Sequence, residues 1–417
     1  MECVDPETLG FIENEYAKLK KTKSRMLMKK YLTKEVFNKT KHRITAGGAT
    51  LYDVIKSGLA NPDSSIGLYA PDAESYTLFH ELFDPVIDEY HGGFGPTDYH
   101  PGINFGTPEA LGDLNEWGNY VVSTRIRCAR SLEGYPFNPL LTLEQYAELE
   151  QDIENALDTL DDDLAGYYRP LNRISLEEQD ELLNQHFLFK HGDRFLEAAG
   201  ACRFWPDGRG IFLNSDCTLI VWINEEDHMR IISMQKGGNL AEVYDRFVRA
   251  VTALGNRLPF SFSQRLGFLN FCPTNLGSAI RASVHVRLPM LGQDRNILEA
   301  TADQFHLQVR GTSGEHSEAK DFIYDISNRR RLGLTEIEAL QEIKSCSEID
   351  NKNVPEATDA FLFVVFNRLF YVLLLFFLCS VPLGSYDALL LSFLQLPPIL
   401  MFSGVHLRTE ELLKDIE

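Results

Sequence analysis

The strongest constraint on the fold is a change in the spacing of apolar residues near residue 120. Before about residue 90, as in FIENEYAKLKK, apolar side chains recur every three or four positions among charges, which predicts amphipathic helices. From Tyr120 onwards, runs such as YVVSTRIRCARS and SVHVRLP alternate apolar with polar residues, as half-buried strands do. The chain therefore combines an all-helical part with a following part that is rich in strands.

The second part also contains helices. Strand-like runs, GIFLN, LIVWIN, RIISMQ and RLGFLNF, alternate with helix-like runs such as LEQYAELEQDIENAL and LAEVYDRFVRAVTAL. Strands joined by hairpins and helices predict the α+β class, with a mostly antiparallel sheet flanked by helices. We expect an all-helical domain over residues 1–95, a Gly- and Pro-rich linker over 96–118, an α+β domain over 119–345 and an atypical apolar tail over 346–417.

Composition excludes several classes of function. The net charge of −20 argues against nonspecific binding of nucleic acid, which depends on neutralising phosphates. Seven cysteines without CxxC spacing are not typical of a disulfide framework or a zinc site, and they favour a reducing compartment such as the cytoplasm. The acidic N-terminus has no apolar segment and does not resemble a signal peptide.

Arginines gather at strand ends and loop starts. On a strand, Arg125 and Arg127 point to the same face, where two like charges repel unless an anion lies between them. The pair alone fits a solvated surface equally well. Three more arginines adjoin other motifs: Arg230 follows NEEDH, Arg281 follows CPTNLG, and Arg310 begins RGTSGEH. Guanidinium groups suit polyphosphate because they form paired hydrogen bonds to phosphate oxygens. No P-loop motif is present, so the arginines would take over the role of a glycine-rich cradle.

Two carboxylates and one thiol accompany these cations. Glu226 and Glu315 could act as a base or clamp a cationic acceptor, or could be surface acids of an acidic protein. Cys272 precedes a proline at a turn near basic residues, which would lower the thiol pKa, whereas a lone cysteine is more often buried and inert. His285 could contact a ligand or be a core histidine. Phosphoryl transfer from a nucleotide fits this set best, with an acceptor that residue types alone do not name.

At these motifs the chain resembles the phosphagen (ATP:guanido) kinases. The stretches that carry the resemblance are CPTNLGSAIRASVHV, STRIRCARSLEGYPFNP, VWINEEDHMRIISMQKGG, ACRFWPDGRGIF and VRGTSGEHSEAKDFIYDISNRRRLGLTE. The resemblance implies a small all-helical N-terminal domain and a larger domain with an antiparallel sheet. It also implies reversible transfer of phosphate between MgATP and a guanidinium, with ADP as the other product. Tyr69 and its short loop resemble the type that uses L-arginine, and such enzymes are commonly monomers.

The resemblance also assigns roles to individual residues. Positions that match the family's ATP-binding residues are Ser123, Arg125, Arg127, Arg230, Arg281, His285, Arg310 and Asp325. Glu226, Glu315 and Cys272 match the catalytic groups around the guanidinium, with Cys272 as a thiolate. The loop DSSIGLY matches the segment that holds the rest of the substrate, through Ser64, Ser65, Ile66, Gly67 and Tyr69. By resemblance, Mg²⁺ arrives with ATP and the protein supplies no metal site of its own.

The sequence departs from the family pattern at several places. Ser65 stands where glycine is common, which would cost about 1 kcal/mol if that position needs a positive φ. Ser313 replaces an arginine, and residues 320–322 replace a Glu-Gly-Gly stretch, so closure of that loop is in question. Two further functions therefore stay open: a catalytically impaired or tail-anchored nucleotide-binding relative, and a kinase for another guanidino substrate.

The tail is the largest departure. Residues 361–378, FLFVVFNRLFYVLLLFFL, hold about fifteen strongly apolar residues, worth on the order of −5 to −9 kcal/mol for membrane insertion, against roughly +3 for Arg368. A membrane segment is physically feasible. An aberrant chain end, such as translated non-coding sequence or an alternative exon, is the interpretation we favour, because the resemblance stops abruptly and Pro397-Pro398 breaks the second apolar run.

Overall fold

The computed structural model describes residues 4–114, 120–289, 291–311 and 321–352, with the backbone alone for 345–352. By its internal contacts the chain divides into two units, Met1–Glu348 and Ile349–Glu417. Both predicted domains lie inside the first unit, and the boundaries that we placed at residues 95 and 119 stay predictions. Glu315, Ser313, Lys320 and the apolar run 361–378 lie outside the described residues. Within those residues, no helix combines the length and apolar character that crossing a membrane requires.

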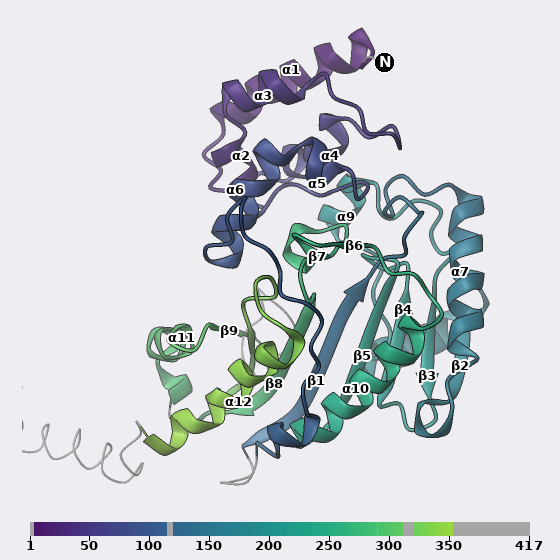
Figure 1. Ribbon diagram of the computed structural model, residues 1–417, viewed down its shortest axis with the longest axis vertical. Helices are drawn as coiled ribbons and strands as arrows, with labels where there is room; N and C mark the ends of the chain where they lie inside the picture. Colours follow the sequence, from purple (N-terminus) through teal and green to yellow (C-terminus); the bar gives the residue numbers. More distant parts are fainter. Residues whose placement is uncertain (1–3, 115–119, 290, 312–320, 353–417) are drawn as a thin grey trace, which may run out of the picture. The chain divides into compact units, whose positions relative to one another are not determined.

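The N-terminal part is helical, as predicted (Figure 1). Its helices are α1 (Pro6–Lys21), α2 (Leu27–Tyr31), α3 (Lys34–Thr40), α4 (Leu51–Ala60), α5 (Ser75–Leu78) and α6 (His80–His91). The α1 helix begins where the Asp5 carboxylate accepts the Thr8 N–H at 2.8 Å, with Pro6 in the first turn. Residues at helical spacing, among them Val54 and Phe83, are fully buried in one apolar cluster.

The second part contains an eight-stranded sheet in the order β2-β3-β4-β5-β1-β8-β10-β9, in which every neighbouring pair is antiparallel. Its strands are β1 (Val121–Arg130), β2 (Gly166–Pro170), β3 (Gly210–Asn214), β4 (Leu219–Ile223), β5 (Met229–Lys236), β8 (Ile280–Arg287), β9 (Leu307–Arg310) and β10 (Ile323–Asn328). The helices here are α7 (Leu143–Leu157), α8 (Leu176–Asn184), α9 (Arg194–Ala199), α10 (Leu240–Gly255), α11 (Arg295–Asp303) and α12 (Glu336–Lys352). The predicted α+β class with an antiparallel sheet is confirmed.

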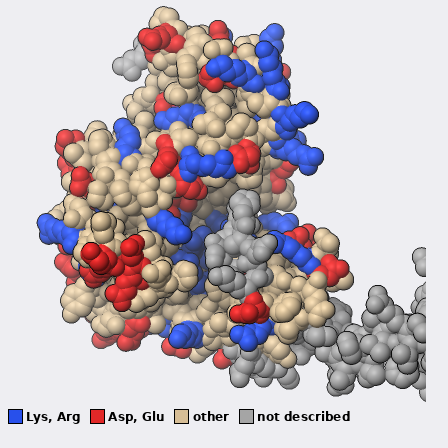
Figure 2. All heavy atoms as spheres, turned by 180° about the vertical axis from the view of Figure 1, so that it is seen from behind, with Lys and Arg blue, Asp and Glu red and all other residues tan. Residues whose placement is uncertain are grey.

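The two faces of the sheet differ in chemistry. Ile126, Cys128 and Val284 project from one face into an apolar cluster that includes Phe247 of α10, which lies across the strands in Figure 1. Alternation then sends Arg125 and the other odd-numbered side chains of β1 to the opposite face. Viewed from behind, Figure 2 shows Lys and Arg side chains gathered in a hollow on that side. The main core covers one face of the sheet. On the opposite face, Ile220, Trp222 and Ile232 of β4 and β5 pack in a second apolar cluster, and the arginines of β1 and β8 lie beside that cluster.

One predicted strand is wrong. The run RLGFLNF (265–271) contributes only the two-residue β7 (Gly267–Phe268), paired with β6 (Phe262–Ser263). Gly267 has a φ of +68°, and a Cβ there would lie 2.6 Å from the Cα of Gly277. The backbone is therefore bent and pressed against the turn that follows Cys272, which a regular strand could not achieve.

Candidate active site

Antiparallel register brings the predicted nucleotide-binding residues to one face of the sheet. Arg127 lies directly opposite Arg281 on β8, and Ser123 lies opposite His285. Asp325 on β10 is opposite both His285 and Arg310. Side chains opposite one another share a face, so this register places the residues on one surface with Arg125 between them. They come from four strands that are up to about two hundred residues apart in the sequence.

Arg125 has hydrogen-bonding capacity that the described part of the chain does not use. Its Nε and one terminal nitrogen are buried and have no hydrogen-bond partner among the described residues. Its guanidinium lies 5.4 Å from the ring centre of Trp222, which holds the group in place. Burial, followed by the charges of Arg281 and Arg230, lowers the pKa of Arg125 to about 10. Unused donors in a cationic environment are what an incoming anion would require.

Arg127 lies at the centre of this cationic face. Its pKa is well below the usual value, first because of burial and then because of Arg230, Arg281 and Arg125. Arg281 has a partial counter-charge, since its guanidinium donates to the Asp325 carboxylate at 2.9 Å. Repulsion between the remaining cations destabilises the ligand-free face, and a polyanion would relieve it.

Arg230 connects the cationic face to the predicted catalytic carboxylate. Its two terminal nitrogens bind Glu225 and Glu226, each at 2.7 Å. Arg230 is 9% exposed and both carboxylates are largely buried, so the triad is shielded from water. The charges of Glu225 and Glu226 raise the pKa of Arg230 above its usual value despite burial. Glu226 therefore lies at the edge of the arginine cluster and carries its negative charge there.

Cys272 lies in an acidic environment, contrary to our expectation. Burial, and then the charge of Glu226, raise the pKa of its thiol well above the usual value. The hydroxyl of Thr274, at 3.1 Å from Sγ, opposes this shift only in part. The prediction that nearby basic residues lower this pKa is wrong for the ligand-free protein, because burial and the charges of Glu226 and Asp227 disfavour the thiolate. A bound cation would reverse the sign of the local charge.

The helical part fixes the segment that carries Cys272. The Tyr76 hydroxyl donates to the Asn270 carbonyl at 2.6 Å, and the Ala70 N–H donates to the Phe271 carbonyl at 2.9 Å. A ring nitrogen of His91 lies 2.9 Å from the Pro273 carbonyl. Three of the four carbonyls from Asn270 to Pro273 are therefore bonded to residues that precede the thiol in the chain by about two hundred positions. These hydrogen bonds, and not only the short turn that follows Cys272, hold the thiol in position.

The loop 63–69 joins the same cluster through Tyr69. The ring of Tyr69 stacks on Phe271 with centroids 4.5 Å apart, and burial, then Cys272 and Glu226, raise its pKa. Gly67 has a φ of +81°, whereas Ser65 does not have a left-handed φ. The strain cost that we considered for serine at position 65 therefore does not arise.

Strain appears instead at the end of the predicted closing loop. Asp321 and Phe322 have φ values of 52° and 59°, a region that glycine adopts at the lowest cost. These residues stand where the family pattern has glycine. Their side chains therefore carry a conformational cost of about 1 kcal/mol each at the base of the loop.

Four residues of the site were missed by sequence reasoning. They are Trp222, Glu225, Asp227 and Asn275. The Asp227 carboxylate accepts the Phe271 N–H at 2.9 Å and the Asn275 amide at 3.1 Å, and burial raises its pKa to about 7. The run NEEDH was the available signal, since three consecutive acids between two apolar strands need partners if the turn is buried. Asp227 is a positioning residue that ties the β4–β5 turn to the Cys272 segment.

His228 follows these acids and is held as the neutral imidazole. Its Nδ1 accepts the Leu132 N–H at 3.0 Å, so Nε2 carries the proton and donates to the Pro136 carbonyl at 3.0 Å. Burial lowers its pKa from 6.5 to about 4. Protonation would break the bond from Leu132 and would place a charge in the interior.

We therefore expect acid to destabilise the fold through His228. Between pH 6.5 and 4 the unfolded state binds the extra proton, so stability present above pH 6.5 is lost as the pH falls, by about 2 kcal/mol at pH 5. Urea unfolding of His228→Gln should show a smaller loss between pH 7 and 5 than the unmodified protein does. Equal losses in both proteins would exclude His228 as the titrating group.

The sequence matches two family models. The model described as ATP:guanido phosphotransferase, N-terminal domain, matches residues 22–88, and the C-terminal catalytic domain of the same family matches residues 148–349. Arginine kinase of Schistocerca americana is 56% identical over 341 residues, which is 82% of this chain and 96% of that protein. Arginine kinase of Limulus polyphemus is 55% identical over 342 residues, with the same coverage of both chains.

Solved structures agree with this result. A lombricine kinase superposes with a TM-score of 0.75 and 39% identity, covering 82% of this chain and 94% of the other. The duplicated taurocyamine kinase of Schistosoma mansoni superposes with a TM-score of 0.77 and 42% identity over 85% of this chain. The present chain spans 50% of that duplicated protein. By sequence, fold and the residues gathered on one sheet face, the chain belongs to the ATP:guanido phosphotransferases.

Proposed function

We propose that this protein is an arginine kinase, which transfers the γ-phosphoryl group of ATP reversibly to the guanidinium of L-arginine and so buffers ATP. The observation that carries the proposal is the bond of Arg230 to Glu226 at 2.7 Å, which joins a cationic face to an acidic cluster. The cationic face attracts a polyphosphate, and the acidic cluster attracts a guanidinium. Relatives of more than 50% identity carry the name arginine kinase.

The nucleotide phosphates would bind the cationic face. Arg125 and Arg127 of β1 would bind phosphate together with Arg281, which lies opposite Arg127 on β8. Arg310 on β9 would close the site from the edge of the sheet. His285 and Ser123, whose side chains lie 3.0 Å apart, would contact the rest of the nucleotide. These cations would stabilise the charge that spreads over the phosphoryl oxygens during transfer.

The acceptor guanidinium would lie between Glu226, Glu315 and Cys272. One guanidinium nitrogen would form the N–P bond, the bond from the γ-phosphorus to the β,γ-bridging oxygen would break, and ADP would leave. The nitrogen would give up its proton to one of the two carboxylates, Glu226 or Glu315. Carboxylates that face this cation would orient the attacking nitrogen and stabilise its charge. The charge of the bound acceptor would also favour the thiolate of Cys272. The loop 63–69 would hold the remainder of the acceptor, through Ser64, Ser65, Ile66, Gly67 and Tyr69.

Mg²⁺ would enter with ATP. Among the described residues there is no cluster of three or more His, Cys, Asp or Glu side chains that could hold a metal ion. Mg²⁺ keeps several waters and binds through phosphates and one or two carboxylates. When bound, the ion would neutralise charge on the β- and γ-phosphate oxygens. Asp325, with one carboxylate oxygen unpartnered among the described residues, faces the same surface.

An acceptor assay tests the proposal. With MgATP, we expect ADP release that depends on L-arginine, together with a phosphorus resonance of phosphoarginine, and little release with creatine, glycocyamine, taurocyamine, lombricine or no acceptor. ADP without phosphoarginine would indicate hydrolysis, and preference for another acceptor would reassign the substrate. Bound nucleotide without any transfer would favour the catalytically impaired relative and would direct attention to residues 313–322 and the tail.

A further inference from the structure

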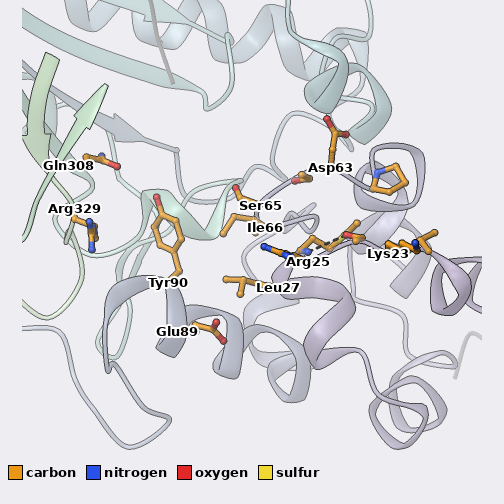
Figure 3. Close-up of a pocket in the computed structure, with 15 residues that line it drawn as sticks. Lys23, Arg25, Leu27, Asp63, Ser65, Ile66, Glu89, Tyr90, Gln308 and Arg329 are labelled. Atoms are coloured by element: carbon orange, nitrogen blue, oxygen red, sulfur yellow. Dashed lines mark hydrogen bonds between the residues drawn. The ribbon is translucent and has the colours of Figure 1, made fainter. Parts of the chain in front are cut away.

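The segment that carries Cys272 also contains a buried amide that the proposed mechanism does not use. Asn270 lies two positions before the thiol and is fully buried. A pocket of about 890 Å³ beside the loop 63–69 is lined by part of that loop, by residues 22–27 and by Tyr90 (Figure 3). Asn270 is not among the lining residues. An amide that is shielded from solvent and lies outside the pocket can affect catalysis only through the residues that it holds.

The Asn270 side chain is bonded at both its nitrogen and its oxygen. Its Nδ2 donates to the Asn275 carbonyl at 2.7 Å and, more weakly, to the Ala129 carbonyl at 3.5 Å. Its Oδ1 accepts the Ser131 hydroxyl at 3.1 Å. The two carbonyls can only accept, so the amide nitrogen must face them. These contacts hold the side chain in one orientation, because turning the amide would leave buried polar groups unpaired.

The bond to Asn275 closes the turn that presents the thiol. Asn270 and Asn275 are the ends of a six-residue segment that contains Cys272, and the 2.7 Å bond joins these ends directly. Inside the segment, the Asn275 N–H donates to the Cys272 carbonyl at 2.9 Å, at the short turn Pro273–Asn275. A segment that is fixed at both ends leaves the thiol little freedom to move.

The same amide joins this turn to the strand that carries two of the arginines proposed to bind phosphate. Ala129 belongs to β1, Ser131 follows β1 directly, and Arg125 and Arg127 extend from the same strand. Asn270 therefore connects the element at the acceptor with an element at the nucleotide. Phosphoryl transfer depends on the alignment of these two substrates, and a misplacement of about 1 Å can cost about 10²-fold in rate.

Asn214 offers a matched comparison away from the site. It is also buried, and it lies at the end of β3. Its Nδ2 donates to the Asp163 carbonyl at 2.8 Å and to the Thr218 hydroxyl at 3.0 Å. Its Oδ1 accepts the N–H groups of Thr218 and Leu219, both at 2.8 Å. The two asparagines thus share burial and hydrogen bonding, and they differ in what they hold.

We propose that Asn270 is a positioning residue, which holds Cys272 at the acceptor and fixes the thiol segment relative to β1. This inference rests on the proposed function. The amide contacts neither substrate, so its loss changes the alignment of bound substrates more than their affinity. The effect therefore belongs in kcat rather than in KM.

The kinetic test compares Asn270→Ala with Asn214→Ala in the full-length protein. Each change removes a buried amide with its hydrogen bonds, so both should lower the melting temperature. At a temperature where both variants are folded, kcat of Asn270→Ala with L-arginine and MgATP should fall about tenfold or more, with both KM values changed less than about threefold. Asn214→Ala should keep kcat within about twofold. Asn270→Ser, which retains one donor, should lose less and serves if the alanine variant does not fold.

Alkylation of Cys272 provides a measurement that does not depend on turnover. The thiol is 7% exposed, and burial, followed by the charge of Glu226, raises its pKa. Loosening the segment should expose the thiol and lower that pKa, and the thiolate is the form that reacts. Iodoacetamide at pH 8 should therefore modify Cys272 about tenfold faster in Asn270→Ala than in the unmodified protein, as followed by mass spectrometry of the peptide that contains it. Asn214→Ala should not change this rate.

Three outcomes would overturn the inference. If Asn270→Ala loses stability but keeps both kcat and the alkylation rate, Asn270 only supports the fold. Faster alkylation with unchanged kcat would show that the placement of the thiol does not limit transfer. A higher KM for L-arginine with unchanged kcat would indicate a role in binding. Failure of the proposed function looks different, because the unmodified protein would then not phosphorylate L-arginine, whereas the alkylation comparison would still test whether Asn270 holds the thiol.

Discussion

Replacing Glu226 by glutamine is expected to lower kcat by about 10²- to 10³-fold while nucleotide affinity changes less than about threefold. The variant keeps the size of the side chain and removes the charge that faces the acceptor. Arg230 stays paired with Glu225 at 2.7 Å, so the cationic face keeps its arrangement. Single-turnover measurements and titration of ADP separate the two effects.

Glu225→Gln is the matched control. It also removes one of the two carboxylates that bind Arg230, at the same 2.7 Å distance. If the effect of Glu226→Gln acts only through Arg230, both variants should lose kcat equally. A much smaller loss in Glu225→Gln is the result that we expect. Turnover close to that of the unmodified protein in Glu226→Gln would remove this carboxylate from the mechanism.

Replacing Arg127 by methionine is expected to weaken ATP binding by about a hundredfold and, at the same time, to raise the melting temperature of the ligand-free protein. Arg127 lies opposite Arg281, and burial, followed by the charges of four neighbouring arginines, lowers its pKa. Removing one cation relieves that repulsion and retains the packing of the stem. The binding loss follows from a missing charge-assisted contact with phosphate. Calorimetry with MgADP and thermal unfolding without nucleotide measure the two quantities.

Arg281→Ala should behave differently in stability. This change also weakens nucleotide binding, but it leaves the buried Asp325 carboxylate without its partner at 2.9 Å, so the melting temperature should fall. Arg249→Ala, which breaks an ion pair with Asp163 at the surface, should leave nucleotide affinity unchanged. A lower melting temperature for Arg127→Met would contradict the view that the ligand-free face is under electrostatic strain.

The sequence predicted much of the secondary structure because periodicity is a local property. The run LEQYAELEQDIENAL coincides with α7, and GIFLN coincides with β3. RLGFLNF failed because its alternation was overruled by the contact of Gly267 with Gly277, which no local pattern reveals. Tertiary contacts of this kind determine the backbone conformation wherever two segments that are distant in the sequence approach closely.

The residue types of the candidate site could be predicted from the sequence, but the contacts between those residues could not. Arginine and carboxylate types are visible in the chain, but Asp227 was passed over because its importance lies in the Phe271 and Asn275 groups that it binds. The sign of the Cys272 pKa shift was wrong because sequence neighbours were taken for spatial neighbours. Electrostatic effects depend on distance and burial, which the order of residues does not contain.

The sequence by itself determined which residues could meet a polyphosphate and a guanidinium, and that helices would precede an antiparallel sheet. Only the tertiary structure decided that β1 pairs with β5 and β8 in a register that turns Arg125, Arg127 and Arg281 to one face. A shift of one residue would have sent one strand's arginines into the core. The burial of the opposite, apolar face against α10 excludes that shift, and so the packing of the core fixes the geometry of the site.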